Sequence, residues 1–301
     1  VYGDDITLSF TASEGIQTPT CTFTSGGQAM ADSSITVTEG DANAWTCVLD
    51  VDNGDTDGSV AFSIAFSDDA GNAGSTAVAV TDGTSVTIDN THPSVSTVTF
   101  ASGDYVNNAE DESAIDLVIV TSGAEDTETV TATLNGADYT CDLSSNTCTA
   151  SITSAALKAL TDGNSYTFSV AVSDTAGNAA TANTAESFTY DVTAPTSTTA
   201  VESVDGTGNA NDADVVTITL DPSETVGTPT CTFTDGIGAM EDTTVTYDTT
   251  GDDSHTAQVT VHNDDDDGAV GFSCTYADLA GNDIASAITV ATSGAVEIDN
   301  T

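Results

Sequence analysis

Positive charge is almost absent from this sequence. Among 301 residues there are 48 Asp and Glu but a single Lys or Arg, Lys158, so the formal net charge at pH 7 is −47. Binding to nucleic acid or to an anionic membrane surface is excluded, because nothing in the chain could neutralise phosphate groups. One cation cannot offset the repulsion among 48 carboxylates, so we expect divalent cations or high salt around the protein.

Long apolar runs are absent as well. No segment approaches the roughly 18 consecutive apolar residues of a membrane span, so we expect no insertion into a membrane. No signal peptide is recognisable and the chain begins with Val1, which predicts a mature product or a piece of a longer protein. The hydrophobic share of 38% nevertheless argues against disorder and for a folded core.

The chain contains an internal repeat. Residues 6–91 (copy 1) align without a gap to residues 216–301 (copy 3), with about 35 of some 86 positions identical. Both copies contain Thr-Pro-Thr-Cys-Thr-Phe-Thr and both end in Ile-Asp-Asn-Thr. A more divergent copy 2 lies between them and shares the sequence Asp-x-Ala-Gly-Asn, which begins at Asp68, Asp174 and Asp278.

Within each copy the apolar residues alternate with polar ones, which predicts β-strands. The alternating sets are Trp45, Cys47, Leu49 and Val51; Val60, Phe62, Ile64 and Phe66; Tyr166, Phe168, Val170 and Val172; and Val270, Phe272, Cys274 and Tyr276. Six or seven such runs per copy, separated by Gly, Asp and Asn turns, are typical of a β-sandwich. The only helical pattern covers residues 154–160.

Three domains follow from the repeat, with boundaries just before Pro93 and Pro195. We predict a domain at residues 1–91 that lacks its first strand, a domain at 92–193 with a short helix, and a domain at 194–301 that is closest to the first. The strand-like stretches at 95–100 and 198–204 have no counterpart at the start of copy 1. We expect a longer array or a neighbouring subunit to supply the missing strand.

The six cysteines fall two to a predicted domain, which favours disulfides and an oxidising compartment over six free buried thiols. Cys21 and Cys231 are aligned, but their proposed partners are not, because Ala257 matches Cys47 and Ile64 matches Cys274. Both partner positions face inward, so we expect two neighbouring strands to reach the same core cysteine. The predicted pairs are Cys21–Cys47, Cys141–Cys148 and Cys231–Cys274.

These features resemble the tandem immunoglobulin-like repeats of giant prokaryotic surface proteins, such as bacterial adhesins and archaeal S-layer proteins. The resemblance rests on the Asp-x-Ala-Gly-Asn turn, the Asp-Asn-Thr-x-Pro and Asp-x-Thr-Ala-Pro junctions and the period of about 100 residues. Residues 160–166 also resemble the corner that leads into strand F of such sandwiches. The resemblance implies an all-β fold of three immunoglobulin-like sandwiches in an elongated rod, located extracellularly on a cell surface.

Calcium is the cofactor that the acidic residues suggest. Asp outnumbers Glu by roughly three to one, and Asp favours turns and chelating loops. The loop containing Asn53, Asp55 and Asp57 has the spacing of the start of a calcium loop, and its counterpart contains Asn263, Asp265 and Asp267. Position twelve of these loops is Ile64 or Cys274, so we expect no isolated EF-hand.

A calcium site at each domain junction is more plausible and resembles the joints of cadherins. At the first junction the loop at 53–57 and Asp89 would face Glu125, Asp126 and Asp174, and at the second Asp162 and Asp191 would face Glu224 and Asp278. Asp299 is the counterpart of Asp89 in copy 3. The alternative interpretation is that all of these are solvated turn residues chosen for backbone geometry.

No catalytic arrangement is apparent. His92, His255 and His262 share no metal-binding spacing and no nucleophile partner, and we expect them at the surface or the edge of the core. The protein is therefore predicted to be a structural component of an extracellular array or filament, with calcium and further copies or adjacent repeats as partners. An adhesin stalk or tip that binds glycan or another surface is the alternative.

Overall fold

The computed structural model of the protein describes residues 1–180, 186–203, 206, 208–248, 254–291 and 293–301. Within these ranges the structure is built of short strands, with one 3-10 turn at Asp41–Asn43 and one helix, α1, at Ser154–Leu157. The predicted all-β class is confirmed. Neither helical segment of the described part has the length and apolarity that a bilayer crossing requires.

The chain packs as two compact units. Unit 1 consists of Val1–Thr99, Val118–Ala150 and Phe168–Ala185, and unit 2 consists of Phe100–Leu117, Ser151–Thr167 and Glu186–Thr301. Copy 1 therefore lies within unit 1 and copy 3 within unit 2. The predicted division into three domains stays a prediction.

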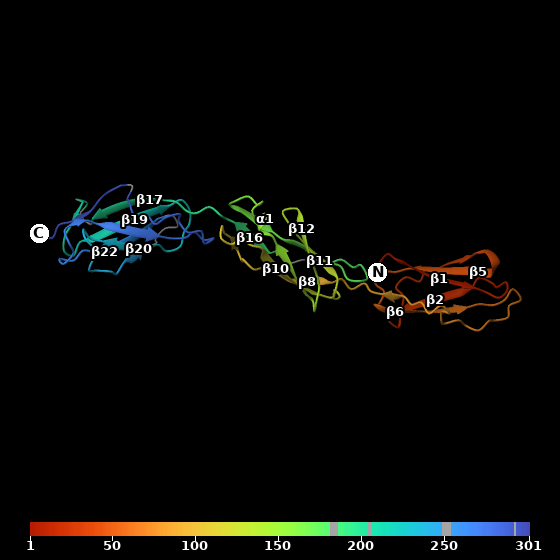
Figure 1. The fold of residues 1–301 in the computed structure, drawn as a ribbon. Helices are drawn as coiled ribbons and strands as arrows, with labels where there is room; N and C mark the ends of the chain where they lie inside the picture. The colour runs from red at the N-terminus through yellow and green to blue at the C-terminus, as the bar shows by residue number, and fades with distance from the viewer. Residues whose placement is uncertain (181–185, 204–205, 207, 249–253, 292) are drawn as a thin grey trace. The chain divides into compact units, whose positions relative to one another are not determined.

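Copy 1 is a sandwich of two small sheets around one core (Figure 1). The first sheet has the order β1-β5-β4, from Asp5–Thr11, Ala44–Asp50 and Thr36–Glu39. The second has the order β3-β2-β6-β7, from Gln28–Ala29, Thr20–Ser25, Gly58–Ala65 and Thr87–Ile88. Leu49 from the first sheet packs with Phe23 and Ile64 from the second. Two sheets that share one core in this way form an immunoglobulin-like sandwich.

Copy 3 repeats this sandwich and adds a strand to it. The larger sheet has the order β17-β19-β22-β21, from Ser197–Ser203, Val215–Pro222, His255–Thr260 and Thr246–Asp248. It faces β20 (Thr230–Thr234) and β24 (Gly271–Thr275), and a small sheet has the order β18-β25-β23, from Asn209–Ala210, Glu297–Ile298 and Gly268–Ala269. The core includes Val201 from β17, Ile218 from β19 and Phe272 from β24.

The strands between the two copies form three sheets of three strands each. Their orders are β13-β10-β8, β12-β11-β15 and β14-β16-β9. The strands are β8 (Ser94–Phe100), β9 (Tyr105–Val106), β10 (Ile115–Ser122), β11 (Thr129–Leu134), β12 (Ala137–Asp142), β13 (Thr147–Ile152), β14 (Asn164–Thr167), β15 (Ser169–Ala171) and β16 (Ser187–Tyr190). The strand predicted at Tyr166–Val172 is thus divided between two sheets.

The predicted helix and the predicted strand F corner are both present in the structure. The helix is shorter than the predicted 154–160 and starts with Thr153, whose hydroxyl accepts a hydrogen bond from the Ala156 N–H at 3.3 Å. The corner is present, because the Thr161 N–H donates to the Tyr166 Oη at 2.7 Å. This bond is the tyrosine corner of immunoglobulin-like domains.

All six cysteines are paired, as Cys21–Cys47, Cys141–Cys148 and Cys231–Cys274. Cys21 lies on β2 and Cys47 on β5, so their disulfide joins the two sheets of copy 1. Cys231 and Cys274 lie opposite each other on β20 and β24, so the disulfide of copy 3 joins adjacent strands of one sheet. The aligned cysteines Cys21 and Cys231 are therefore bonded differently. Cys21 is bonded across the core of copy 1, and Cys231 is bonded within one sheet of copy 3.

Candidate functional site

The acidic loop of copy 1 is bonded to its own chain. The buried Asp55 carboxylate accepts the N–H groups of Ala31 at 2.7 Å and Asp52 at 2.8 Å. The Asp57 carboxylate accepts the Asn90 N–H at 2.7 Å and the Thr91 hydroxyl. These two bonds, with the Thr91 hydroxyl the stronger cause, hold the pKa of Asp57 below its usual value. The loop thereby fastens the C-terminal end of copy 1.

Copy 3 repeats this arrangement at the aligned positions. The buried Asp265 carboxylate accepts the N–H groups of Glu241 at 2.7 Å and His262 at 2.8 Å, and Asp267 accepts the Asn300 N–H at 2.7 Å. The two remaining asparagines of the predicted loops, Asn53 and Asn263, are exposed. The described contacts of both loops match the alternative interpretation in which the acidic residues serve backbone geometry.

At the first junction, residues 89–92 meet the Asp-x-Ala-Gly-Asn loop that begins at Asp174. The Asn178 amide donates to the Asp89 carbonyl at 3.0 Å, and the Nδ1 atom of His92 lies 2.8 Å from the Ala179 carbonyl. The Asp174 carboxylate accepts the Asn178 main-chain N–H at 2.8 Å and its side-chain amide at 2.9 Å. The linker is therefore tied to the loop by hydrogen bonds.

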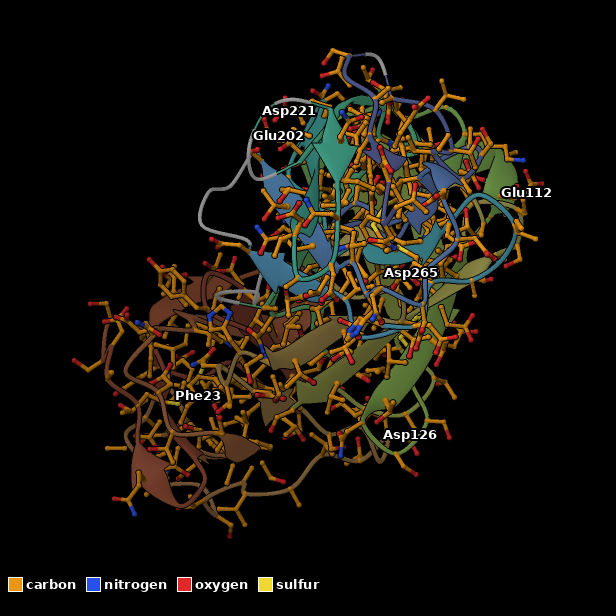
Figure 2. The ribbon with its side chains drawn as sticks, turned by 90° about the vertical axis from the view of Figure 1, so that its left-hand side faces the viewer. Phe23, Glu112, Asp126, Glu202, Asp221 and Asp265 are labelled. Carbon is orange, nitrogen blue, oxygen red and sulfur yellow. A yellow bond between two sulfur atoms is a disulfide. The ribbon has the colours of Figure 1, made fainter. Side chains whose placement is uncertain are left out.

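The other acidic residues predicted for the first junction point to different partners. The Glu125 carboxylate accepts the Thr175 N–H at 2.9 Å, and this bond is the main cause that lowers the pKa of Glu125. Asp126 lies in a loop (Figure 2) and accepts the Ser145 N–H at 2.6 Å. The Asp89 carboxylate accepts the Thr91 N–H at 3.0 Å. Among the described residues, these carboxylates do not form a metal-sized group.

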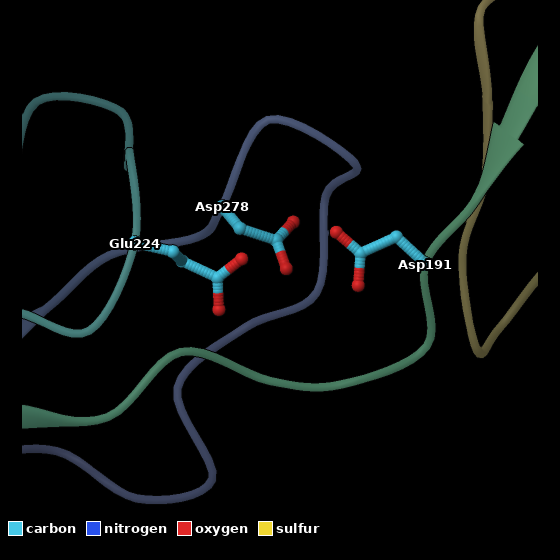
Figure 3. A group of neighbouring side chains, drawn as sticks. All are labelled: Asp191, Glu224 and Asp278. Atoms are coloured by element: carbon cyan, nitrogen blue, oxygen red, sulfur yellow. The ribbon is translucent and has the colours of Figure 1, made fainter. Parts of the chain in front are cut away.

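The second junction brings three carboxylates together. One oxygen from each of Asp191, Glu224 and Asp278 lies within 4.8 Å of the others, the only such group in the part of the chain that the structure describes. The three side chains point toward one another from three separate segments (Figure 3). Asp278 is only 6% exposed, and its carboxylate accepts the Asn282 N–H at 2.8 Å and the Asn282 amide at 2.9 Å.

The electrostatics of this trio differ from those of the other acidic loops. Burial raises the pKa of Asp191, and the negative charge of Asp278 adds to the increase. Burial also raises the pKa of Glu224, with the charges of Asp191 and Asp278 as further causes. The Lys158 ammonium lies 2.8 Å from Glu112, so the only Lys or Arg side chain of the sequence is already paired. A cation would relieve the mutual repulsion of the trio.

Asp162, the fourth residue predicted for this junction, has other partners. Its carboxylate accepts the Val192 N–H at 2.8 Å and the Thr193 hydroxyl. The Thr193 bond is the largest cause that lowers the pKa of Asp162. Asp299 similarly accepts the Thr301 N–H at 3.3 Å. Asp162 therefore holds the segment at 192–193, about 30 residues further along the chain, whereas Asp299 bonds within its own turn.

Several asparagines were missed by the sequence analysis. The Asn282 amide donates to the Asp191 carbonyl at 2.8 Å, and its Oδ1 atom accepts the Asn108 N–H at 3.0 Å. The Asn107 amide donates to the Ala280 carbonyl at 2.9 Å. The Asn of the repeated Asp-x-Ala-Gly-Asn sequence therefore bonds the preceding linker in copies 2 and 3. The repetition of that Asn is the signal that the sequence offers, although the motif by itself predicts only a turn.

The three histidines occupy different environments. His92 and His262 are exposed, while His255 is buried on β22. His255 takes the aligned position of Trp45, which is buried on β5. The prediction of a surface or core-edge histidine is therefore wrong for His255, because inward positions of this strand face the core of copy 3.

No protein-family model and no curated protein sequence matches the chain. Among solved structures, a structure of a 1.5-MDa bacterial ice-binding adhesin is 21% identical, has a TM-score of 0.47, and covers 99% of this chain and 92% of that chain. A calcium-stabilised adhesin with which an Antarctic bacterium binds ice is 21% identical, with a TM-score of 0.44 and coverages of 99% and 70%. An I-band fragment of titin is 11% identical, with a TM-score of 0.43 and coverages of 100% and 94%. These TM-scores lie below 0.5, so the function of this chain has to be argued from its own residues.

Proposed function

We propose that this chain is a structural segment of an extracellular cell-surface protein, in a surface array or in the stalk of an adhesin. Hydrogen bonds and calcium would fix each repeat to the one before it. Three disulfides suit a protein of an oxidising, extracellular compartment. Further copies of the chain, or adjacent repeats, are its proposed partners.

The observation that carries this proposal is the bond from a loop asparagine to the preceding linker. Asn178 donates to the Asp89 carbonyl at 3.0 Å, and Asn282 donates to the Asp191 carbonyl at 2.8 Å. Both asparagines are buried and are oriented by the aspartate of the same motif. The same joint at two successive junctions supports a role in spacing, because it constrains the linker at both places.

Calcium is proposed for the second junction. Calcium binds six to eight oxygens at about 2.4 Å, so two ligands on opposite sides of one ion are about 4.8 Å apart. The carboxylate oxygens of Asp191, Glu224 and Asp278 lie within 4.8 Å of one another, so an ion at their centre would be at most about 2.8 Å from each, and a small movement of the side chains would bring all three into contact with it. Water molecules would complete the coordination, since both oxygens of Asp278 also accept hydrogen bonds from Asn282.

Thermal unfolding at low salt tests the calcium proposal. At a free calcium concentration 100 times the dissociation constant, the gain in stability is about 2.7 kcal/mol, equivalent to a rise in Tm of roughly 5–10 °C for a segment of this size. Addition of EDTA should reverse the rise. An unchanged Tm in calcium, at low salt, contradicts the proposal.

Matched variants locate the effect. Glu224→Gln should remove most of the calcium-dependent rise, because it replaces a ligand that carries charge. Glu14→Gln is the control, since Glu14 is the aligned and exposed residue of copy 1 and should leave the rise intact. Equal loss in both variants would indicate general charge screening in place of a specific site.

A further inference from the structure

The loop at 107–111 of copy 2 contacts copy 3. The Asn107 amide donates to the Ala280 carbonyl at 2.9 Å, and the Asn108 N–H donates to the Asn282 Oδ1 atom at 3.0 Å. Both acceptors belong to the Asp-x-Ala-Gly-Asn loop of copy 3, and all of these residues lie in unit 2. Loop 107–111 therefore holds this loop of copy 3 at a second place, in addition to the bond from Asn282 to the linker.

The glycines of the three repeated Asp-x-Ala-Gly-Asn loops show that this contact is specific to copies 2 and 3. A Cβ atom at Gly281, φ +91°, would lie 3.2 Å from the Asn107 amide nitrogen. The matching glycines Gly71 and Gly177 also have positive φ angles, but a Cβ atom there would meet no described atom within 4 Å. Only at Gly281 does a neighbouring side chain use the space that a missing Cβ leaves.

The Asn107 side chain is oriented by its own loop. Its Oδ1 atom accepts the N–H groups of Ala109 at 2.9 Å and Glu110 at 3.0 Å. The Asn107 N–H donates to the Glu110 carboxylate at 3.1 Å, and its carbonyl accepts the Asp111 N–H at 3.1 Å. Because its oxygen is held inside the loop, the amide nitrogen of Asn107 is directed at Ala280.

The buried Asp111 carboxylate joins this loop to the end of copy 2. Asp111 is 5% exposed and accepts the Tyr190 hydroxyl at 2.6 Å, and Tyr190, itself 4% exposed, directly precedes Asp191 of the linker. Burial raises the pKa of Tyr190, and the bond to Asp111 is the next cause, so the hydroxyl stays a donor. One buried hydrogen bond therefore connects the loop that contacts copy 3 with the start of the linker.

A buried carboxylate needs a compensating charge, above all in a chain with a net charge of −47. Lys158, the only Lys or Arg, has its Nζ atom 4.0 Å from Asp111 and 2.8 Å from Glu112. The Ser154 hydroxyl donates to the Asp111 carbonyl at 2.6 Å. Ser154 begins α1 and Lys158 follows its last residue. This short helix therefore brings both a hydroxyl and a positive charge to Asp111.

We propose that Asp111 is a positioning residue, which holds loop 107–111 so that Asn107 and Asn108 fix the repeated loop of copy 3 against copy 2. Lys158 supplies the counter-charge of Asp111. The inference rests on the proposed function, in which each repeat is fixed to the one before it, but it does not require calcium. It assigns a role to the one positive side chain that this acidic sequence contains.

Hydrogen exchange of the whole chain in EDTA, measured at the Asn108 and Asn282 amides, tests the proposal. Tyr190→Phe removes the bond to Asp111 and should speed exchange at both amides at least about tenfold. Tyr166→Phe is the matched control, because it also removes a hydrogen-bonded hydroxyl from copy 2, in the tyrosine corner outside loop 107–111. It should leave exchange at both amides unchanged.

Two further variants separate the contact from its support. Asn107→Asp keeps the oxygen that the loop uses but removes the amide that donates to Ala280, so it should also speed exchange at Asn282 at least about tenfold. Lys158→Gln should speed exchange at the same amide, and Lys158→Arg should restore it, because Arg keeps the positive charge.

Each result that would overturn the proposal is distinct from a failure of the proposed function. Unchanged exchange at Asn108 and Asn282 in both Tyr190→Phe and Asn107→Asp would overturn the role of the loop. The same acceleration in Tyr166→Phe would show general loosening of copy 2 and would also overturn it. No effect of Lys158→Gln would refute the counter-charge. Unprotected exchange at Asn282 in the unaltered chain would instead contradict the proposed function, because the second junction would not be fixed at all.

Discussion

Copies 1 and 3 are similar in sequence, but their hydrophobic cores are covered by different sets of strands. Both have the same acidic loop, with Asp55 and Asp265 buried and accepting two main-chain N–H groups each. Copy 3 has β17 at the edge of its larger sheet and a disulfide within the other sheet, whereas copy 1 lacks that strand and has a disulfide between its sheets. Local motifs survive in both copies, while burial depends on a strand outside the aligned segment.

The largest expected effect comes from the disulfides. Loss of Cys231–Cys274, which closes 43 residues, should lower the free energy of unfolding by about 4 kcal/mol, and loss of Cys21–Cys47, which closes 26 residues, by about 3.5 kcal/mol. Paired Cys→Ala variants, unfolded in urea, measure both losses. A clearly larger loss in copy 1, read from Trp45 fluorescence, would show that its disulfide compensates for the missing strand. If removal of Cys21–Cys47 leaves the Trp45 unfolding transition unshifted, the prediction is wrong.

Next in size is a matched pair of valines. Val296→Ala removes buried methyl groups from a side chain that is 2% exposed and should cost about 2 kcal/mol, while Val86→Ala, at the aligned position that is 48% exposed, should cost less than about 0.5 kcal/mol. Urea midpoints followed by circular dichroism and by Trp45 fluorescence measure the two. Equal costs would mean that Val86 is as well buried in solution as Val296, and the contrast between the copies would fail.

Asp57 and Asp267 should behave alike, because both fasten the end of their copy. Each Asp→Ala change should cost about 0.5–1 kcal/mol at pH 7, since the carboxylates are exposed. The pKa of Asp57 is lowered by Thr91 and Asn90, so its contribution is full above its unfolded-state pKa and disappears as the pH falls through the folded value. Asp57→Asn should therefore flatten the acid limb of the Trp45 unfolding curve below about pH 4. An unaltered acid limb would be evidence against the role of Asp57.

The smallest expected effect is the change in stability when Glu224 is neutralised, compared with neutralising the aligned Glu14. The pKa of Glu224 is raised, so the ionised group destabilises the metal-free chain at pH 7, and this penalty disappears as the pH falls below the unfolded-state value. Glu224→Gln in EDTA should raise stability at pH 7 by about 0.5 kcal/mol and have no effect near pH 3. Glu14→Gln should change neither value. Destabilisation by Glu224→Gln in EDTA at pH 7 would contradict the repulsion.

Much of the fold was predictable because local patterns carry it. The alternation around Trp45, Cys47 and Leu49 predicted the buried face of β5, and the structure confirms it. The division of the strand around Tyr166 between two sheets was not predictable, since alternation alone does not specify which neighbour a strand pairs with.

The junctions were predictable only in part. Asp191, Glu224 and Asp278 were assigned to one joint from their places in the repeat, and the structure brings them within 4.8 Å. Glu125, assigned to the first joint in the same way, instead accepts the Thr175 N–H at 2.9 Å. Side-chain direction depends on packing around each loop, so calcium binding at either joint stays a prediction.

The sequence by itself determined the class of the fold, the repeat and the scarcity of positive charge. These properties depend on composition, spacing and strand period, which are local. Only the tertiary structure decided which carboxylates meet, which asparagines join the linkers and which core stays open. Those outcomes depend on strand pairing between distant segments. The two aligned copies differ by one strand, and the aligned valines Val86 and Val296 are therefore buried to very different extents.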